Sequence, residues 1–533
     1  MNVIKKIKLP FILLLLIAAL VTYIFYDKAV IVNHDKSLPA QIKNNQAVSN
    51  PSLINNPKTI AVLPFVNVSN ENEQEFFADG LTEELLNKIA KIPKLKVIAR
   101  TSSFFYKDTN EDLRVIGKKL GVKYILEGSV RKSDDMVRIS AKLIHASDGF
   151  QLWSQIYDRS FKNVLDIQDE ISVEVAKALN IVLDAKSTQA MKSSGVSNVD
   201  AFIAYQKGLQ LYDLAHGHGK DKVEVLTQAN LQFDIAIKLE PEFASAYFHQ
   251  SDLFSHILLY ATESDEQLAI AHKKLSKSLQ SAALFAKDPL LKLYININNI
   301  LHSNDWNLLP TFADRAADYD SCLQPLYFPV LLNFGYQDTL MKIYQYIINC
   351  DPLNPIGYYG VATTELHNWQ PEQALILIAK GEQLTGRHDW YTLKKIIAYF
   401  QLKDFDEATR AIESLKHRPL LYKIHLATLH AMMGNGETGL AYIKELRETK
   451  PSNYIRYSIV LAAAIGNVKL ANELAAALDA KPAGSFQLMQ TVFACGCGAP
   501  FDINHTPNFK RRIEEAKFSW PPKSILLYPN KNW

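Results

Sequence analysis

The stretch TIAVLPFVN at residues 59–67, followed by LKVIAR at 95–100, decides the fold of the first part of the chain. Both are short apolar runs bounded by polar or turn-forming residues, as expected of buried strands. Three further runs have strand character, KYILEGSVRK (123–132), MVRISAKLIHA (136–146) and FQLWSQIYDR (150–159). Because only short turn-like segments join these three, they predict consecutive antiparallel hairpins.

Helical segments are predicted between and after these strands. The first lies near ADGLTEELLNKIA (78–90), with Asp79 or Thr82 as its N-cap. The second, DLRVIGKKLG (112–121), ends at a glycine suited to a C-cap. Apolar residues at helical spacing predict the third from 164 to 183. The order βαβαβββα indicates an α/β domain with a mixed sheet.

This domain, residues 59–187, contains polar residues that could hold a ligand. Ligands of α/β sheets bind beyond the carboxyl ends of the strands, and polar side chains follow the first two strands here. An arginine with neighbouring hydroxyls and a helix N-terminus could bind an anion or a peptide carboxylate. The alternative is that these side chains cap helices and satisfy loop backbone groups. The candidate ligand-binding or partner-binding residues are Asn67, Asp79, Thr82, Arg100, Ser102 and Ser103.

Several separated motifs of this domain resemble the TolB-like amino-terminal domain. They are AVLPFVNVS (61–69), FFADGLTEELLNKIAKIPKLKVIARTSSFFYK (76–107), IGKKLGVKYILEGSVRK (116–132) and LWSQIYDR (152–159). The resemblance implies a bacterial membrane protein in which this domain lies beside tetratricopeptide repeats. Many such chains are similar to ToxR/CadC-type regulators with a cytoplasmic winged helix, and others to chains with an adenylate-cyclase domain. Only eight residues precede the apolar segment here, so we expect neither output domain.

The N-terminus predicts a membrane anchor. Residues 9–26 begin with the uncharged run LPFILLLLIAALVTYIF, which is long enough to span a bilayer. Lysines precede it, so residues 1–8 are expected in the cytoplasm and the remainder in the periplasm of a bacterial inner membrane. A cleaved signal peptide is the rival interpretation, but no A-x-A-like site follows the apolar run. Residues 27–58 are polar and rich in Asn, Ser and Pro, which favours a flexible linker.

Helical periodicity replaces the strand pattern in residues 198–482, which predict an all-α solenoid of the tetratricopeptide type. The clearest trace is QANLQFDIAIKLEPEFASAY (228–247), in which small and aromatic residues and a proline recur at steps of 4, 3 and 5. GNGETGLAYIKELRETKP (434–451) repeats those steps. About seven or eight repeats are expected from the spacing of the helix-ending prolines. The residues that carry the repeat signature are Tyr205, Gly208, Ala229, Phe233, Ala236, Pro241, Tyr247, Gly439 and Pro451.

Such arrays form a groove that holds a peptide or a partner helix. The alternative is that the array only extends or dimerises the protein. Residues 483–533 resemble the tail common in chains of this kind and are expected to cap the end of the solenoid. Cys495 and Cys497 in this tail form C-x-C, which fits a local turn, a disulfide of an oxidising compartment, or a metal or redox role.

Composition and motifs argue against several other functions. A net charge of +3 is too small a bias to indicate nucleic-acid binding. We find no Walker loop, no G-x-S-x-G, no H-E-x-x-H and no Rossmann fingerprint, so no enzyme, cofactor or metal is expected. His216 and His218 form H-x-H, but two ligands alone are a weak metal signal. The sequence therefore predicts a membrane-anchored periplasmic scaffold that binds proteins or peptides, or else the periplasmic sensory component of a transmembrane signalling or transcription-regulatory system.

Overall fold

The computed structural model describes residues 58–69, 75–184, 196–216, 222–260, 264–303, 305–317, 328–449 and 454–529. The expected anchor, residues 9–26, and most of the linker lie outside these ranges. Among the described residues, no helix is both long and apolar enough to cross a membrane. Residues 57–533 cluster as one compact unit.

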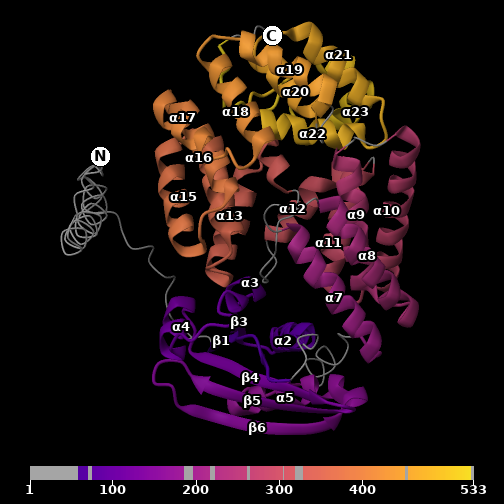
Figure 1. Ribbon diagram of the computed structural model, residues 1–533, viewed down its shortest axis with the longest axis vertical. Helices are drawn as coiled ribbons and strands as arrows, with labels where there is room; N and C mark the ends of the chain where they lie inside the picture. Colours follow the sequence, from indigo (N-terminus) through magenta and orange to yellow (C-terminus); the bar gives the residue numbers. More distant parts are fainter. Residues whose placement is uncertain are drawn as a thin grey trace, which may run out of the picture. The chain divides into compact units, whose positions relative to one another are not determined.

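The N-terminal part is an α/β domain built on a mixed sheet, which confirms the expected fold class (Figure 1). Its elements are β1 (Lys58–Val62), β2 (Val66–Asn67), α2 (Glu75–Ile89), β3 (Leu95–Val97), α3 (Arg100–Phe104), α4 (Leu113–Leu120), β4 (Tyr124–Ser133), β5 (Met136–His145), β6 (Gln151–Ser160), η3 (Phe161–Asn163) and α5 (Val164–Ala178). The strand order is β3-β1-β4-β5-β6, with β2 paired to β4. β1 runs parallel to β3 and β4, whereas β4, β5 and β6 are antiparallel.

Alternating side chains of the sheet form two separate cores. Ile60 and Val62 of β1 point into a core with α2 and α5, while Ala61 points into a second core with α4. This alternation follows from the pleat of a strand. Both faces of the sheet at β1 are therefore covered by helices.

Three details of this domain differ from expectation or refine it. Pro64 separates β1 from β2, as expected of a residue that donates no ladder hydrogen bond. Gly121 ends α4 with a left-handed φ of 67°, as predicted. The third helix ends at Ala178 instead of residue 183, and Asn180 then adopts a left-handed φ of 51°.

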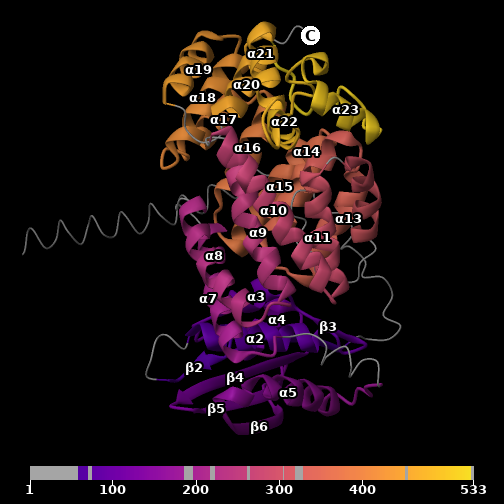
Figure 2. The same ribbon diagram turned by 90° about the vertical axis from the view of Figure 1, so that its right-hand side faces the viewer.

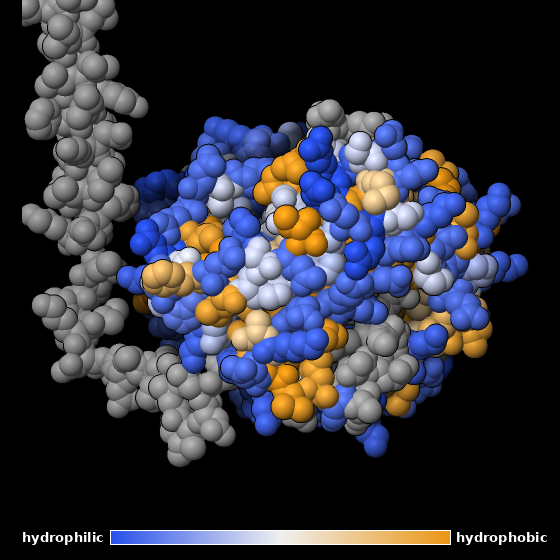
Figure 3. Space-filling view, turned by 90° about the horizontal axis from the view of Figure 1, so that it is seen from below, coloured by the Kyte–Doolittle hydropathy of each residue, from blue (hydrophilic) through white to orange (hydrophobic). Residues whose placement is uncertain are grey.

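The surface formed around β5 and β6 is largely hydrophilic, with separate hydrophobic patches (Figure 3). On the outer face of the sheet, Arg138 of β5 pairs with Asp158 of β6 at 2.7 Å. Ile156 is 60% exposed on β6, which forms one edge of the sheet. This side of the domain therefore faces solvent in the structure.

Helices predominate among the described residues after the α/β domain (Figures 1 and 2). They are α7 (Val199–His216), α8 (Lys222–Leu239), α9 (Ala244–Tyr260), α10 (Asp265–Phe285), α11 (Pro289–His302), η4 (Trp306–Leu308), α12 (Leu309–Ala317), η5 (Phe328–Phe334), α13 (Gln337–Cys350), α14 (Pro355–His367), α15 (Pro371–Thr385), α16 (Asp389–Leu402), α17 (Phe405–Glu413), α18 (Pro419–Met432), α19 (Glu437–Thr449), α20 (Tyr454–Ala464), α21 (Val468–Asp479), α22 (Gly484–Cys495), η6 (Ile503–His505) and α23 (Pro507–Glu515). Consecutive helices pack against each other, as in a helical array.

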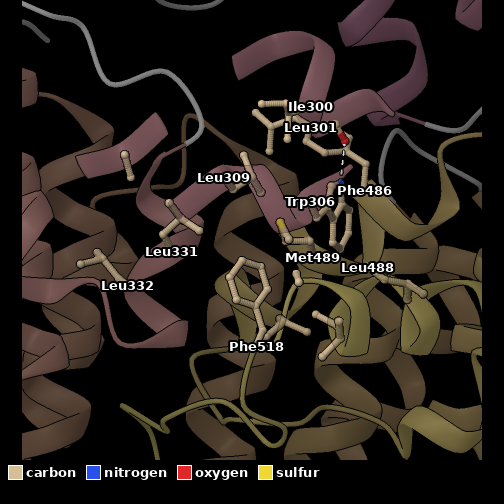
Figure 4. Close-up of a cluster of buried hydrophobic side chains, with 14 of the residues drawn as sticks. Ile300, Leu301, Trp306, Leu309, Leu331, Leu332, Phe486, Leu488, Met489 and Phe518 are labelled. Atoms are coloured by element: carbon tan, nitrogen blue, oxygen red, sulfur yellow. Dashed lines mark hydrogen bonds between the residues drawn. The ribbon is translucent and has the colours of Figure 1, made fainter. Parts of the chain in front are cut away.

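The largest core of the array joins its middle to its C-terminal end. Trp306 is fully buried, and its Nε1 donates to the carbonyl oxygen of Leu301 at 3.1 Å. Phe486, Met489 and Phe518 from the C-terminal part pack into the same cluster (Figure 4). The tail thus contributes to the central core as well as to the last helices.

The final segment also reaches α14–α16. Trp369 Nε1 donates to Ser524 O at 3.1 Å, and Gln401 Nε2 donates to Ile525 O at 2.8 Å. Tyr528 is buried with Ile396 and Phe400 of α16. The expectation of a cap on the solenoid end is therefore too narrow, because the tail packs along the middle of the array as well.

Candidate functional site

The predicted helix start within α2 is wrong. The helix begins at Glu75, so Asp79 and Thr82 lie in its second and third turns and cap nothing. Thr82 Oγ1 instead donates to Ala78 O at 2.8 Å and accepts from Phe65 N at 2.9 Å. The buried hydroxyl ties the helix to the segment between β1 and β2, which is a structural role.

Asp79 and Asn67 are likewise engaged within the α/β domain. Asp79 is paired with Lys107, whose Nζ lies 2.6 Å from Oδ2. Burial raises the pKa of Asp79, and the Lys107 ammonium offsets only part of that effect. Asn67 Oδ1 accepts from Ser69 N at 2.9 Å, in a turn after β2. For these residues the alternative interpretation, local satisfaction of polar groups, fits the structure.

Arg100, the first residue of α3, connects the α/β domain with the first helix of the array. Its Nε lies 3.2 Å from Glu83 Oε2 of α2, and its Nη2 lies 3.1 Å from Asp213 Oδ2 of α7. Burial opposes the positive charge, but the two carboxylates outweigh it and raise the pKa of Arg100. The guanidinium is therefore paired with two carboxylates of this chain, and no external anion is needed to balance its charge.

Ser102 holds a third internal carboxylate, that of Asp351. Asp351 follows α13, and its Oδ1 accepts from Ser102 N at 2.8 Å and from the Ser102 hydroxyl. Ser102 Oγ in turn accepts from Leu353 N at 2.8 Å, and Ala99 N donates to Cys350 O at 3.1 Å. The carboxylate bound at this position is therefore that of residue 351 of the same chain.

An apolar contact accompanies these hydrogen bonds. Leu353 is 7% exposed and belongs to the second core of the α/β domain, together with Ala61, Ile98 and Tyr106. Asn354 Nδ2 donates to Asp351 Oδ2 at 2.8 Å, which satisfies the other carboxylate oxygen. We call residues 99–103 with residues 350–354 the docking junction.

Burial sets the electrostatics of the docking junction. Asp351 is 2% exposed, and this burial raises the pKa of its carboxyl group. Hydrogen bonds from Ser102 and Asn354 act in the opposite direction without cancelling the effect. Ser103 is also buried, but its hydroxyl finds no hydrogen-bond partner among the described residues. Ser102 is therefore the hydroxyl that links the two parts.

A second contact between the two parts involves α2 and α7. Phe202 of α7 lies in the core of the α/β domain, with its ring 6.3 Å from that of Phe77 and perpendicular to it. A Cβ on Gly80 would lie 2.5 Å from Gln206 and 2.8 Å from Phe202. Glycine at position 80 therefore permits this close approach.

The repeat-signature residues of the first helices lie mostly in one core. Tyr205, Ala229, Phe233 and Ala236 are buried together between α7 and α8. Gly208 allows this packing, because a Cβ there would lie 2.4 Å from Phe233.

The other signature residues are distributed along the array. Pro241 follows α8, and Tyr247 stacks on Phe285 at 6.1 Å. Gly439 packs against Ile465, while Pro451 lies outside the described residues.

Three polar residues of the array form the one group within the described residues whose side chains could together hold a metal ion. They are His216 of α7 and Asp252 and His256 of α9. Burial would raise the pKa of Asp252, but the neighbouring imidazoles lower it well below its usual range. His218, the other histidine of the predicted H-x-H pair, lies outside the described residues.

Cys495 and Cys497 form a disulfide, which decides between the alternatives left by the C-x-C motif. Gly496 between them has a left-handed φ of 61°. Both sulfur-bearing residues are buried. Cys350 is disulfide-bonded as well.

Sequence reasoning missed Asp351, Leu353 and Asn354. They lie in the segment CDPLNP (350–355), whose prolines and polar residues are typical of an ordinary connection between two helices. One signal was available, an apolar leucine placed between polar and proline residues in a short connection. It could indicate that the connection packs on another surface, but not on which one.

One comparison with known proteins is located on the α/β domain. A family model described as HilA/YgeH-like transcriptional regulator, second domain, matches residues 56–174. Residues 56–174 are similar to that domain. The chain is also 39% identical over 158 residues to a protein of Rhizobium meliloti (strain 1021) named "Putative adenylate cyclase 3".

The second match covers 30% of this chain and 27% of that relative. The chain therefore spans about a quarter of the length of the curated relative it matches. The matching family has a different name from the TolB-like domain expected from the motifs, and it indicates a regulatory or signalling context.

Proposed function

We propose that this chain is a regulatory component of a transmembrane signalling system, in which the α/β domain is held against a helical sensory array. The observation that carries the proposal is the docking junction. A domain similar to one from transcriptional regulators is fixed to the array by a buried carboxylate, Asp351, and a buried leucine, Leu353. Of the two functions expected from the sequence, this evidence favours the sensory one over the scaffold.

The docking junction suits a two-state contact. It rests on a few buried hydrogen bonds and one apolar side chain, and the ion pairs of Arg100 lie beside it. A ligand shifts such an equilibrium only by binding one state more tightly. In this proposal a protein or peptide bound to the array moves residues 350–354, and the α/β domain is released or retained accordingly.

The proposed location is the periplasmic side of a bacterial inner membrane. The apolar run at residues 9–26 would supply a single anchor, with residues 1–8 in the cytoplasm. The Cys495–Cys497 disulfide supports an oxidising compartment. The proposal includes a tetratricopeptide-type array, with which the small and aromatic residues packed between α7 and α8 are consistent. It also includes a TolB-like α/β domain, on the motifs given above.

The proposal includes no catalytic step. Of the polar residues expected to form a site, Asn67, Asp79, Thr82, Arg100 and Ser102 make hydrogen bonds or ion pairs with other residues of this chain. The proposed partners are proteins or peptides and the membrane, without nucleic acid. The relative's name attributes cyclase activity to a protein about three quarters of whose length lies outside the match.

A genetic experiment tests the regulatory role. The gene is deleted in its native host and complemented with wild type, Ser102→Ala or Ser103→Ala at equal protein abundance. We expect deletion to change a defined set of transcripts, which wild type and Ser103→Ala restore and Ser102→Ala does not. An unchanged transcript profile after deletion would contradict the proposal.

Crosslinking in intact cells distinguishes the scaffold function. A regulatory role predicts capture of a membrane protein with a cytoplasmic output domain. Capture of envelope-assembly components alone, with no transcript change, would favour the scaffold.

A further inference from the structure

His216, Asp252 and His256 gather at one place between α7 and α9. Asp252 and His256 are four residues apart on α9 and therefore share a helix face. His216, the last residue of α7, faces them. One nitrogen or oxygen of each residue lies within 4.8 Å of the other two. The side chains are 31%, 18% and 11% exposed in chain order, so the group is largely shielded from solvent.

The distances fit ligands placed around a common centre. Asp252 Oδ2 lies 3.3 Å from His216 Nε2 and 3.4 Å from His256 Nδ1. Zinc bonds to histidine nitrogen and carboxylate oxygen are about 2.0–2.2 Å long, which in a tetrahedron separates neighbouring ligand atoms by roughly 3.3–3.5 Å. Both observed separations fall in that range.

The tautomer of His216 supports this arrangement. Its Nδ1 lies 2.8 Å from the carbonyl oxygen of Tyr212, an acceptor, so this nitrogen carries the hydrogen. In the neutral ring the lone pair is then on Nε2, which faces the Asp252 carboxylate. Two acceptors facing each other require a cation between them, either a proton or a metal ion. Metal-binding histidines commonly donate the hydrogen of their other ring nitrogen to a backbone carbonyl in this way.

Within the part of the chain that the structure describes, the other polar and charged groups near these three residues do not supply a fourth ligand. His249 is occupied elsewhere, since its Nδ1 lies 2.8 Å from Ser245 O and 3.1 Å from Tyr205 Oη. The Tyr212 ring packs on His216 at 4.3 Å and covers it. Lys222 at the start of α8 contributes an unfavourable positive charge. By the same criterion His256 Nδ1, 3.1 Å from Asp252 O, carries the hydrogen in this structure, so an ion bound at this atom would break that contact and move the hydrogen to Nε2.

We propose that His216, Asp252 and His256 bind a divalent transition-metal ion, with zinc as the best match. Two imidazoles and one carboxylate are a ligand set typical of zinc, and they leave a fourth position open for water or an external group. The ion links the end of α7 to the middle of α9. The proposal does not depend on the regulatory function, because metal binding is measured directly.

The test measures Zn²⁺ binding to the purified full-length chain by isothermal titration calorimetry at pH 7.5. Co²⁺ serves as a second probe, because its visible absorption reports the coordination geometry. The variants are His216→Ala, Asp252→Asn and His256→Ala. The matched control is His417→Ala, which removes a histidine that pairs with Asp389 at 3.0 Å on the surface.

We expect one site per chain in wild type and in His417→Ala. Each of the three ligand variants should weaken Zn²⁺ binding at least about 100-fold, the upper end of the loss seen when only an outer contact of a metal site is removed. Zinc should raise the Tm of wild type but not of the variants. Asp252→Asn retains the size of the side chain, and His216→Ala changes a helix end, so both should fold without metal.

Two results would overturn the proposal. One is the absence of a Zn²⁺ site in wild type, which would leave a proton as the cation between Asp252 and His216. The other is unchanged affinity and an unchanged Co²⁺ spectrum in Asp252→Asn and His216→Ala, which would place any bound metal elsewhere.

Discussion

Replacing Ser102 by alanine should open the docking junction without disturbing either of the parts that it joins. The Ser102 hydroxyl donates to Asp351 Oδ1 and accepts from Leu353 N, so one atom satisfies two groups on the opposite segment. Alanine removes both contacts. The Asp351 carboxylate retains Ser102 N and Asn354 Nδ2, whereas the Leu353 amide loses the acceptor on Ser102.

The size of the effect follows from these two contacts. A hydrogen bond to a charged group contributes about 1.5–3 kcal/mol, and a buried amide without a partner costs about 1–3 kcal/mol. Since neighbouring contacts are not additive, we expect about 2–4 kcal/mol for the free energy of local opening. That free energy corresponds to roughly 30- to 1000-fold faster hydrogen exchange of the backbone amides that exchange only when the junction opens.

Hydrogen–deuterium exchange of the full-length chain measures this opening. Exchange should accelerate in residues 99–104 and 350–354 of Ser102→Ala, and remain unchanged in β4 and β5. Ser103→Ala is the matched control on the same helix, because the Ser103 hydroxyl makes no hydrogen bond within the described residues. Equal protection in Ser102→Ala and wild type would refute the reasoning, as would equal loss in both variants.

Three further predictions concern the core, pH and the cysteines. Trp306→Ala should lower the free energy of unfolding, measured in urea, by about 3–5 kcal/mol, because a fully buried indole is lost. Trp390→Ala, at a 39% exposed position, should lower it far less. Similar losses in the two variants would contradict the burial of Trp306 in the central core. Burial and the neighbouring Glu83 charge raise the pKa of Glu84 from 4.5 to about 7, so its contribution to stability is present below pH 4.5 and is lost as pH rises through about 7. Glu84→Gln should therefore raise the Tm at pH 8 but not at pH 4.5. Glu448→Gln, at an exposed position, should change the Tm at neither pH. An equal gain in Tm for Glu84→Gln at both pH values would contradict a destabilising charge on Glu84. Alkylation of denatured, unreduced protein from the native host should leave Cys350, Cys495 and Cys497 unlabelled, and labelling of the last two would contradict an oxidising compartment.

Local patterns were sufficient to predict most elements of the α/β domain. The strand expected at 95–100 was wrong at its end, because β3 stops at Val97 and Arg100 begins α3, a helix that was not predicted. Alternating and continuous apolar runs indicated the strands, and Gly121 ended α4 as its left-handed conformation requires. The start of α2 was misplaced because Asp79 resembles an N-cap residue, whereas Asp79 lies inside the helix and its carboxylate is paired with Lys107, which follows α3. That ion pair is a tertiary contact, and helix propensity does not report it.

The partners of the candidate site could not be predicted. The arginine and hydroxyls at residues 100–103 led us to expect an external ligand, whereas the structure shows them in contact with carboxylates of the same chain, of which Asp351 lies 249 residues from Ser102 in the sequence. Any buried or exposed carboxylate, internal or external, satisfies the same local pattern. The contact between His216 and Asp252 could not be predicted either, because it forms only where α7 packs beside α9.

Zero-length carbodiimide crosslinking of the unmodified full-length chain tests most directly whether the α/β domain is docked on the array. Lys91, between α2 and β3, lies 3.9 Å from Asp288, which caps α11. Both side chains are accessible, at 23% and 40% exposure, and Lys107–Asp79 provides a positive control within one domain. The account predicts a Lys91–Asp288 amide within single chains, shown by mixing ¹⁵N-labelled and unlabelled protein. Formation of the Lys107–Asp79 link without the Lys91–Asp288 link, or a Lys91–Asp288 link only between chains, would contradict it.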